Sequence, residues 1–384
     1  MKKTLLIIVI ILVVIIALPG FNLIRWMFQS KKPMDIILVD KTVPDIEREN
    51  HRAISWILTN GRFVDKENKS NYSLTKDYYG FMPMKPVRER QWNRNDYHLA
   101  DVPTLADQND AIYVADAYGV YTNDWYRGFS RTRRSRKLYG GFNNNDYLLV
   151  KEMKDRNKLI ILEYNSFDYP TSAFDSYRTQ ERLGIRSTGW TGKYFSSLDS
   201  TAHNFPVWMT QMYRKEHRQP WAFTKPGIVI VNQKSIIVLE EGIHLDMALP
   251  YIVSDTAMCE KFGICSSVAF DKWFDIVDPL SSNILSSYQL HTTALGDTLL
   301  MDYNLLNSFP AVTQDAASPN VYYFAGDFAH NDKPYWTSKF MGVDKLKRFF
   351  YSENPDDPRR FFWLYYKPLV RTIFDDYYAS ITDK

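Results

Sequence analysis

Three acidic residues of the first half of the chain each end a short apolar segment, where a carboxylate can bind a ligand or transfer a proton. They are Asp40, Asp116 and Glu163. If these segments are parallel strands, the acids lie beside one crevice, because ligands of open α/β sheets bind beyond the strand carboxyl ends. Acids there can act as general acid or base. Asp116 and Glu163 are therefore candidate catalytic residues and Asp40 a candidate ligand-binding residue, unless they only cap the following turns.

Other candidate residues follow these acids closely. Tyr118 comes two residues after Asp116, and Asn165 comes two residues after Glu163. Both stand in the loops that would line the crevice, so both are candidate ligand-binding residues. Asp327 follows an aromatic strand-like segment in a Gly-Asp turn. It is either another binding or catalytic acid or part of a tight turn.

Well-marked enzyme motifs do not accompany these acids. The sequence has no Gly-x-Ser-x-Gly elbow, no Walker loop and no Gly-x-Gly-x-x-Gly fingerprint, which argues against the classes that carry them. A glycosidase remains open, because it needs only two suitably spaced carboxylates. We expect no cofactor and no metal. The nearest metal-like group, Glu240-Glu241-Gly242-Ile243-His244-Leu245-Asp246, is either a divalent-ion site or a solvated loop.

Alternating strands and helices predict an α/β fold with a doubly wound, mostly parallel sheet. The predicted strands are 35–40, 111–116 and 158–163, and the predicted helices follow Pro44 and cover 146–156 and 174–183. Beyond about residue 205 the pattern indicates antiparallel strands, with a hairpin at 227–231 and 235–239 and further strands at 283–293, 298–303 and 321–325. Helices on either side of a Pro-rich break at 355–358 are expected to close the chain.

Residues 35–200 resemble the class I glutamine amidotransferase-like domains, a flavodoxin-like family. The resemblance covers less than half of the chain and rests on strand order and on segments 159–165, 171–183 and 189–195. The family's enzymes carry a nucleophilic cysteine on a Gly-x-Cys-x-Gly elbow, whereas the first cysteine here is Cys259. No catalytic residue therefore carries over. The resemblance implies the fold and a ligand crevice, with Trp190 as a candidate contact, and not glutamine hydrolysis.

An apolar run at residues 5–24 follows two lysines and has the length that spans a bilayer. A cleaved signal peptide is the alternative, but no Ala-x-Ala site follows. We expect a single-pass anchor that binds membrane lipid, with the bulk of the chain outside the cytoplasm. Trp26 and Phe28 fit an interfacial aromatic anchor.

A basic segment and two cysteines complete the candidates. Arg133 and Arg134 belong to a run at 127–137 that contains no acid. This run either binds an anionic lipid, acidic glycan or acidic partner, or is a solvated loop. Cys259 and Cys265 are close enough in sequence to form a disulfide in an exported compartment, and two unpaired thiols are the alternative.

These observations predict three parts: a membrane anchor at 1–32, an α/β domain at 33–225, and a β-rich segment with C-terminal helices at 226–384. No Gly, Ser or Pro linker separates the last two, which allows them to pack as one unit. The net charge of +3 is too small to indicate nucleic-acid binding. Aromatic residues make up 15% of the chain and either contact sugar rings or fill the core.

We expect a membrane-anchored, non-catalytic ectodomain that binds a ligand or partner, a glycan or a membrane protein, in cell-surface polysaccharide handling. The alternative is a membrane-tethered carbohydrate-active hydrolase that uses the strand-end carboxylates, so whether the chain is an enzyme stays open.

Overall fold

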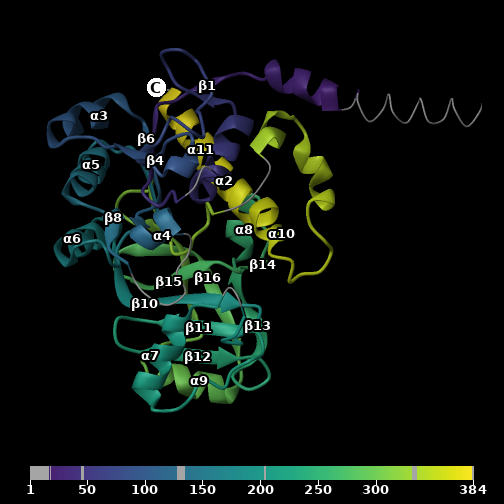
Figure 1. The fold of residues 1–384 in the computed structure, drawn as a ribbon. Coiled ribbons are helices and arrows are strands. Elements are labelled where there is room, and N and C mark those ends of the chain that lie inside the picture. The colour runs from purple at the N-terminus through teal and green to yellow at the C-terminus, as the bar shows by residue number, and fades with distance from the viewer. Residues whose placement is uncertain are drawn as a thin grey trace, which may run out of the picture.

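A computed structural model describes residues 17, 19–44, 47–127, 135–202, 205–330 and 335–382. The chain forms a mixed α/β fold with one large sheet, a smaller sheet and C-terminal helices (Figure 1). Within the described ranges, no helix combines the length and apolar composition needed to cross a bilayer. Most of the predicted anchor at 5–24 lies outside those ranges.

The large sheet is mixed rather than mostly parallel. In spatial order its strands are β14 (Ser267–Ala269), β13 (Leu245–Val253), β16 (Ser282–Thr292), β17 (Ser308–Asp315), β18 (Val321–Phe324), β9 (Leu159–Glu163), β6 (Ala111–Asp116), β2 (Ile36–Asp40), β4 (Tyr79–Pro83) and β5 (Trp92–Asn95). The run from β18 to β4 is parallel, and the pairs outside it are antiparallel. Strands β2, β6 and β9 are buried throughout, as expected where helices cover both faces of a sheet.

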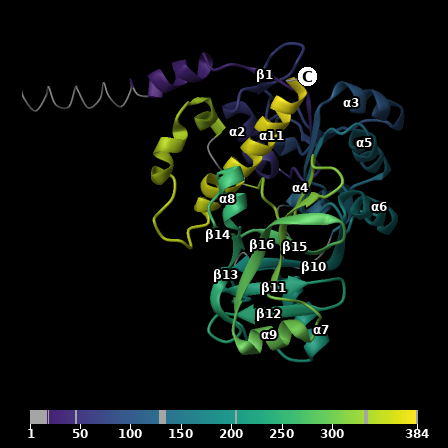
Figure 2. The same cartoon turned by 180° about the vertical axis from the view of Figure 1, so that it is seen from behind.

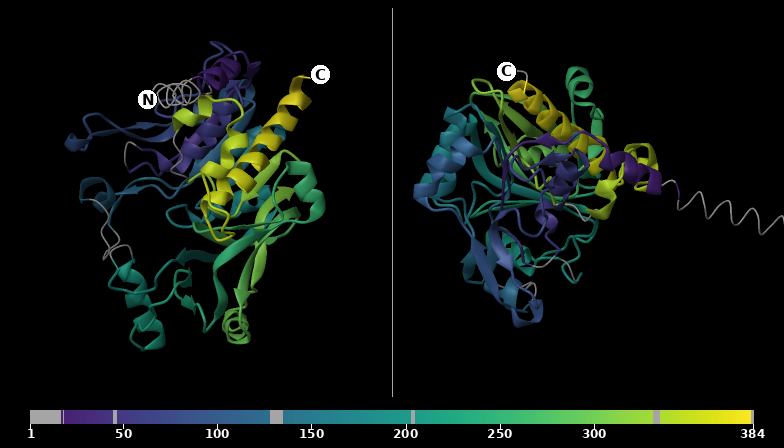
Figure 3. Two further views of the ribbon diagram at one scale, coloured as in Figure 1. Left: turned by 90° about the vertical axis from the view of Figure 1, so that its right-hand side faces the viewer. Right: turned by 90° about the horizontal axis from the view of Figure 1, so that it is seen from above.

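Helices cover the two faces of the parallel part. Figures 1 and 3 show α3, α5 and α6 stacked along one side, with α2 and α11 on the other. The helices are α2 (Glu49–Asn60), α3 (Val102–Gln108), α4 (Thr122–Arg127), α5 (Asn144–Asp155), α6 (Ala173–Leu183), α7 (Val207–His217), α8 (Thr256–Phe262), α9 (Ala294–Met301), α10 (Arg359–Phe361) and α11 (Lys367–Thr382). Short 3-10 segments are η1 (Val87–Glu89), η2 (Leu99–Asp101), η3 (Tyr335–Lys339) and η4 (Val343–Phe349), and a π turn spans Phe362–Tyr366.

The smaller sheet joins the parts on either side of residue 225. Its order is β12 (Ile236–Glu240), β11 (Gly227–Val231), β10 (Ile185–Phe195) and β15 (Trp273–Pro279), all antiparallel. Strand β10 precedes residue 225 and pairs with β11 and β15, which follow it. In the large sheet β18 likewise lies beside β9. Figure 2 shows the smaller sheet below the large one, with α7 and α9 at its lower end. Two short pairs, β1 (Lys32–Pro33) with β3 (Phe63–Val64) and β7 (Val120–Tyr121) with β8 (Lys137–Tyr139), complete the strands.

Local sequence signals account for most of these elements. The side chain of Asn143 accepts the N–H of Asn145 at 2.8 Å, and Asp146 bonds back to the N–H of Asn143, so a capping box starts α5. The predicted hairpin at 227–239 is confirmed by β11 and β12. The predicted strand at 298–303 is wrong. That segment lies largely in α9, because Thr293 caps the helix by accepting the N–H of Gly296.

The predicted disulfide is not formed in the structure. Cys259 and Cys265 are both free thiols, and each is partly exposed. The Cys259 Sγ faces the carbonyl oxygen of Ser254 at 3.7 Å, whereas the Cys265 Sγ faces that of Ser267 at 3.3 Å. The two sulfurs therefore have different hydrogen-bond partners at opposite ends of α8.

Candidate functional site

Four buried acids line the carboxyl edge of the parallel strands. Asp40, Asp116 and Glu163 are the last residues of β2, β6 and β9. Asp40 pairs in register with Asp116, and Phe324 at the end of β18 pairs with Glu163. Asp327 follows β18 in the next turn and is also buried. The structure thus brings the three predicted acids together and adds Asp327 to them.

Glu163 is fully occupied by hydrogen bonds inside the protein. Its Oε2 accepts the N–H groups of Phe328 at 3.0 Å and Ala329 at 2.9 Å. Its Oε1 accepts the hydroxyl of Tyr113, which lies 2.7 Å from that of Tyr366. Burial raises the pKa of Glu163 well above its usual value, although the bond from Tyr113 opposes the shift. With no exposed surface, Glu163 ties β9 to the loop after β18 and cannot reach a ligand in this conformation.

Asp40 is occupied as well. Its Oδ1 accepts the N–H of Thr42 at 2.9 Å, and its Oδ2 contacts Nδ1 of His51, which lies on α2. The other ring nitrogen of His51 donates to the carbonyl oxygen of Leu74 at 2.9 Å, because a carbonyl oxygen can only accept. Asp40 therefore connects β2 to the helix that covers it.

Asp116 and Asp327 are the two acids with oxygen atoms left for a ligand. The Oδ1 of Asp116 accepts the N–H of Tyr118 at 2.6 Å and the hydroxyl of Thr42 at 2.9 Å. No hydrogen bond from the described residues reaches its Oδ2. The Oδ1 of Asp327 is buried and also has no hydrogen-bond partner within the described part of the chain. Burial, followed by the charges of Asp327 and Asp40, raises the pKa of Asp116 well above its usual value.

His330 places a positive charge beside Asp327. Its Nδ1 lies 3.1 Å from Oδ2 of Asp327, and its Nε2 lies 3.4 Å from Oε2 of Glu49 on α2. Burial alone would lower the pKa of His330, but the charge of Asp327 and the bonds to Asp327 and Glu49 raise it to about 10. The imidazolium form of His330 therefore places a positive charge against the Asp327 carboxylate.

Two aromatic residues and a lysine lie close to these two acids. The N–H of Asp327 bonds to the carbonyl oxygen of Trp273 at 3.0 Å. The ring of Trp273 lies nearly parallel to that of Tyr164, with 6.4 Å between their centroids. The Nζ of Lys193 lies 5.5 Å from the centroid of Trp273, and burial lowers the pKa of this lysine. Partly exposed Trp273 and Lys193 can thus contact a ligand that reaches Asp327.

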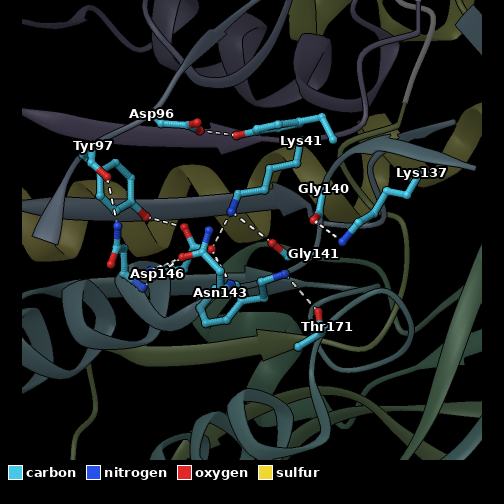
Figure 4. A network of polar contacts seen from close by, with 12 residues as sticks. Lys41, Asp96, Tyr97, Lys137, Gly140, Gly141, Asn143, Asp146 and Thr171 are labelled. Carbon is cyan, nitrogen blue, oxygen red and sulfur yellow. Dashed lines mark hydrogen bonds and ion pairs between the residues drawn. The ribbon is translucent and has the colours of Figure 1, made fainter. Parts of the chain in front are cut away.

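Behind this edge, Lys41 anchors the loop after β2 (Figure 4). Its Nζ pairs with Asp146 at the start of α5 and donates to the carbonyl oxygen of Gly141 at 3.0 Å. Tyr97 donates its hydroxyl to the other oxygen of Asp146. Both charged side chains are almost fully buried, so this ion pair fixes the loop that carries Thr42 against α5.

A second carboxyl pair, Asp168 and Asp275, lies beyond Tyr164. The Oδ2 of Asp275 accepts the hydroxyl of Tyr323 at 2.6 Å, while its buried Oδ1 has no partner within the described ranges. Burial and then the charge of Asp168 raise the pKa of Asp275, and the N–H of Asn165 opposes the shift. The backbone N–H of predicted Asn165 therefore lies near Asp275, and Asn165 adopts a left-handed conformation with φ of 66°. Asp168 also borders a cavity of about 210 Å³ with Gly189, Asn232, Gln233 and Lys234.

The remaining predicted residues fall elsewhere. Trp190 is buried in β10 and packs edge-on against Tyr303, with 5.5 Å between the two ring centroids. Tyr118 is exposed next to Asp116. Arg133 and Arg134 lie outside the described residues. Glu240, from the metal-like group, accepts the N–H groups of residues 224 and 225, and among the described residues no three metal-ligating side chains cluster.

Sequence reasoning missed Asp275, Lys193, Trp273 and His330 as members of the site. Asp275 had a sequence signal, because it stands inside the apolar segment 273–279. An acid in such a segment is expected to be buried, and a buried carboxylate needs a specific partner. Lys193 and Trp273 have no local signal and reach the edge only because β10 and β15 approach the turn after β18. His330 belongs to that turn and stands three residues after Asp327.

Comparisons with known proteins give weak structural likenesses. No known family and no curated protein matches the sequence. The β-galactosidase of Bacillus circulans sp. alkalophilus is similar with a TM-score of 0.33 and 8% identity, over 79% of this chain and 30% of that one. The β-galactosidase of Rahnella sp. R3 gives 0.32 and 11%, over 83% and 31%. A ThuA-like protein of Bacteroides uniformis gives 0.35 and 9%, over 86% and 97%. The chain thus spans less than a third of either β-galactosidase.

Proposed function

We propose that this chain is a membrane-held ectodomain that binds a polar ligand, a glycan, at the edge formed by Asp116 and Asp327 without turning it over. The observation that carries the proposal is the Oδ1 of Asp327, which has no hydrogen-bond partner in the described part of the chain and which a ligand would reach once the side chains that cover it move. An acceptor buried without a partner is costly, and a ligand hydroxyl would satisfy it.

The chemistry around Asp327 suits a sugar. Carboxyl oxygens accept hydrogen bonds and a carboxyl group that keeps its proton can also donate one, so Asp116 and Asp327 can pair with hydroxyl groups. Trp273 is a partly exposed residue whose carbonyl oxygen bonds to Asp327, and sugar rings pack their apolar faces on aromatic side chains. Glu163, one of the two acids predicted to be catalytic, is instead sealed by Tyr113 and two backbone N–H groups.

A glycan array with the full chain in detergent tests this proposal, with calorimetry for any glycan retained. We expect Asp327→Asn and Trp273→Ala to lose at least about tenfold in affinity, as for removal of a buried hydrogen bond to a charged group. Asp278→Asn, at an acid exposed on the far end of β15, is the matched control and should bind normally. Normal binding by Asp327→Asn would refute the assignment of this edge.

A membrane-tethered carbohydrate-active hydrolase is the second candidate, because the raised pKa of Asp116 is a property of general acids. Release of reducing ends from the bound glycan, abolished in Asp116→Asn and retained in Glu163→Gln, would establish it in place of simple binding.

The membrane part of the proposal rests on the apolar run at residues 5–24. We expect the chain to resist carbonate extraction and a C-terminal reporter that works only outside the cytoplasm to be active. Co-purification of a membrane protein from detergent would identify a partner.

A further inference from the structure

The helical segment at residues 19–27 presents an apolar face to solvent. Phe21, Ile24 and Phe28 follow one another at helical spacing, and all three are exposed, with Phe28 at 85%. Soluble surfaces rarely leave aromatic residues this open at successive helical positions. We therefore expect another molecule to cover this apolar face.

The body of the protein holds this helix in place. The Nε1 of buried Trp26 donates to the carbonyl oxygen of Thr59 at 3.2 Å, and the guanidinium of Arg62 lies 4.3 Å from the Trp26 ring centroid. The N–H of Met341 bonds to the carbonyl oxygen of Asn22 at 3.1 Å. These contacts orient the helix so that the apolar face points away from the body.

A second segment, distant in sequence, extends the same surface. Figures 1 and 3 show η3 and η4 beside the N-terminal helix. Within them Trp336, Leu346 and Phe349 are exposed, Phe349 at 85%. Residues 335–350 carry four basic residues and one acid. We call residues 19–28 and 335–349 together the anchor-side surface.

A cavity of about 310 Å³ lies between the two segments. It is lined by Asn22, Arg25, Met341, Gly342, Lys345 and Leu346. Neither Arg25 nor Lys345 forms an ion pair with any residue that the structure describes. These two cations over an apolar floor match an anionic headgroup attached to an acyl chain.

We propose that the anchor-side surface lies on the bilayer and seats the headgroup of an anionic phospholipid between Arg25 and Lys345. Three observations favour lipid over a protein partner: the apolar run at 5–18 leads directly into this helix, the exposed side chains are aromatic and aliphatic, and the nearby charge is basic. The proposal rests on the membrane attachment proposed above and adds that a segment more than 300 residues later in the chain also touches lipid.

Quenching by acyl-brominated lipid tests the contact. The full chain, with Cys259→Ser and Cys265→Ser, carries an environment-sensitive dye at Phe349→Cys in vesicles of equimolar phosphatidylcholine and phosphatidylglycerol. The control carries the dye at Leu306→Cys, a position exposed to 71% between α9 and β17. Figure 1 shows α9 at the opposite end of the molecule from the N-terminal helix. We expect at least roughly twofold quenching at position 349 and none at 306, since the interfacial face enters the acyl boundary.

Neutralising the two cations tests the proposed headgroup site. Arg25→Gln/Lys345→Gln should weaken the quenching, with a roughly fivefold loss in the docking equilibrium per cation, as about 1 kcal/mol each implies. Phosphatidylcholine alone should weaken it similarly. The matched control Arg214→Gln/Lys215→Gln, two exposed cations of α7, should leave it unchanged.

The outcomes separate this inference from the proposed attachment. A chain that resists carbonate but shows no quenching at position 349 refutes the surface and leaves the attachment standing. If the quenching at position 349 is unchanged in the cation variants and in vesicles of phosphatidylcholine alone, the headgroup site between Arg25 and Lys345 is refuted. A chain that carbonate removes from the vesicles refutes the attachment and this inference together.

Discussion

The imidazole Nδ1 of His330 lies 3.1 Å from Oδ2 of Asp327. This contact joins the turn after β18 to α2, because the other ring nitrogen faces Glu49. It places one positive charge against an edge that carries four acids. The stability and the binding properties of this edge therefore depend on which groups are protonated.

Replacing His330 by Gln should remove a pH-dependent stabilisation. The pKa of His330 is raised in the folded state from 6.5 to about 10. A raised pKa stabilises the fold in full below the unfolded value and loses that effect as the pH rises through the folded value. The difference in unfolding free energy between wild type and His330→Gln should therefore shrink between pH 6.5 and about 10. Urea titrations across this window measure it; a constant difference would contradict the ion pair.

The Asp116→Asn variant should be at least as stable as wild type at alkaline pH. The pKa of Asp116 is raised, so its ionisation destabilises the fold progressively as the pH rises above the unfolded value. The amide removes the repulsion with Asp327 and Asp40, and its oxygen can still accept from Tyr118 and Thr42. Thermal unfolding at several pH values checks this, and a variant that loses stability at alkaline pH would contradict it.

Two substitutions of Glu163 should differ strongly in the unfolding free energy that they cost. Glu163→Ala leaves two buried N–H groups without an acceptor and opens a cavity, so we expect a loss of about 3 kcal/mol or more. Glu163→Gln keeps an oxygen for Phe328 and Ala329, and we expect a loss below about 1.5 kcal/mol. Denaturant unfolding compares them. Equal losses would show that Glu163 does not hold this loop through its hydrogen bonds.

Breaking the Lys41–Asp146 pair on one side should cost about 3–5 kcal/mol, because a buried charge loses its partner. We therefore expect Lys41→Met to be strongly destabilised, and Lys41→Met/Asp146→Asn to recover much of the loss. Lys151→Met breaks an exposed pair with Asp155 and is the control, with an expected cost below about 1 kcal/mol. If the double variant is no more stable than Lys41→Met, the loss in Lys41→Met does not come from an uncompensated charge at Asp146.

The elements nearest the site were predictable because their signals are local. The apolar run at 111–116 is β6 to the residue, and Asn143 starts α5 through its own side chain. The prediction failed at 298–303, where apolar content suggested a strand and Thr293 instead caps a helix. Apolar content alone does not distinguish a short buried helix from a strand.

Sequence alone determined that acids stand at the ends of buried parallel strands, because strand length and apolar content are properties of consecutive residues. Only the tertiary structure decided which acid is sealed and which retains a free oxygen. Glu163 is closed by N–H groups 165 and 166 residues later in the chain, and the carbonyl oxygen of Trp273 on β15 accepts the N–H of Asp327 in the turn after β18. Pairings over such distances arise from the packing of whole sheets, which no local pattern records.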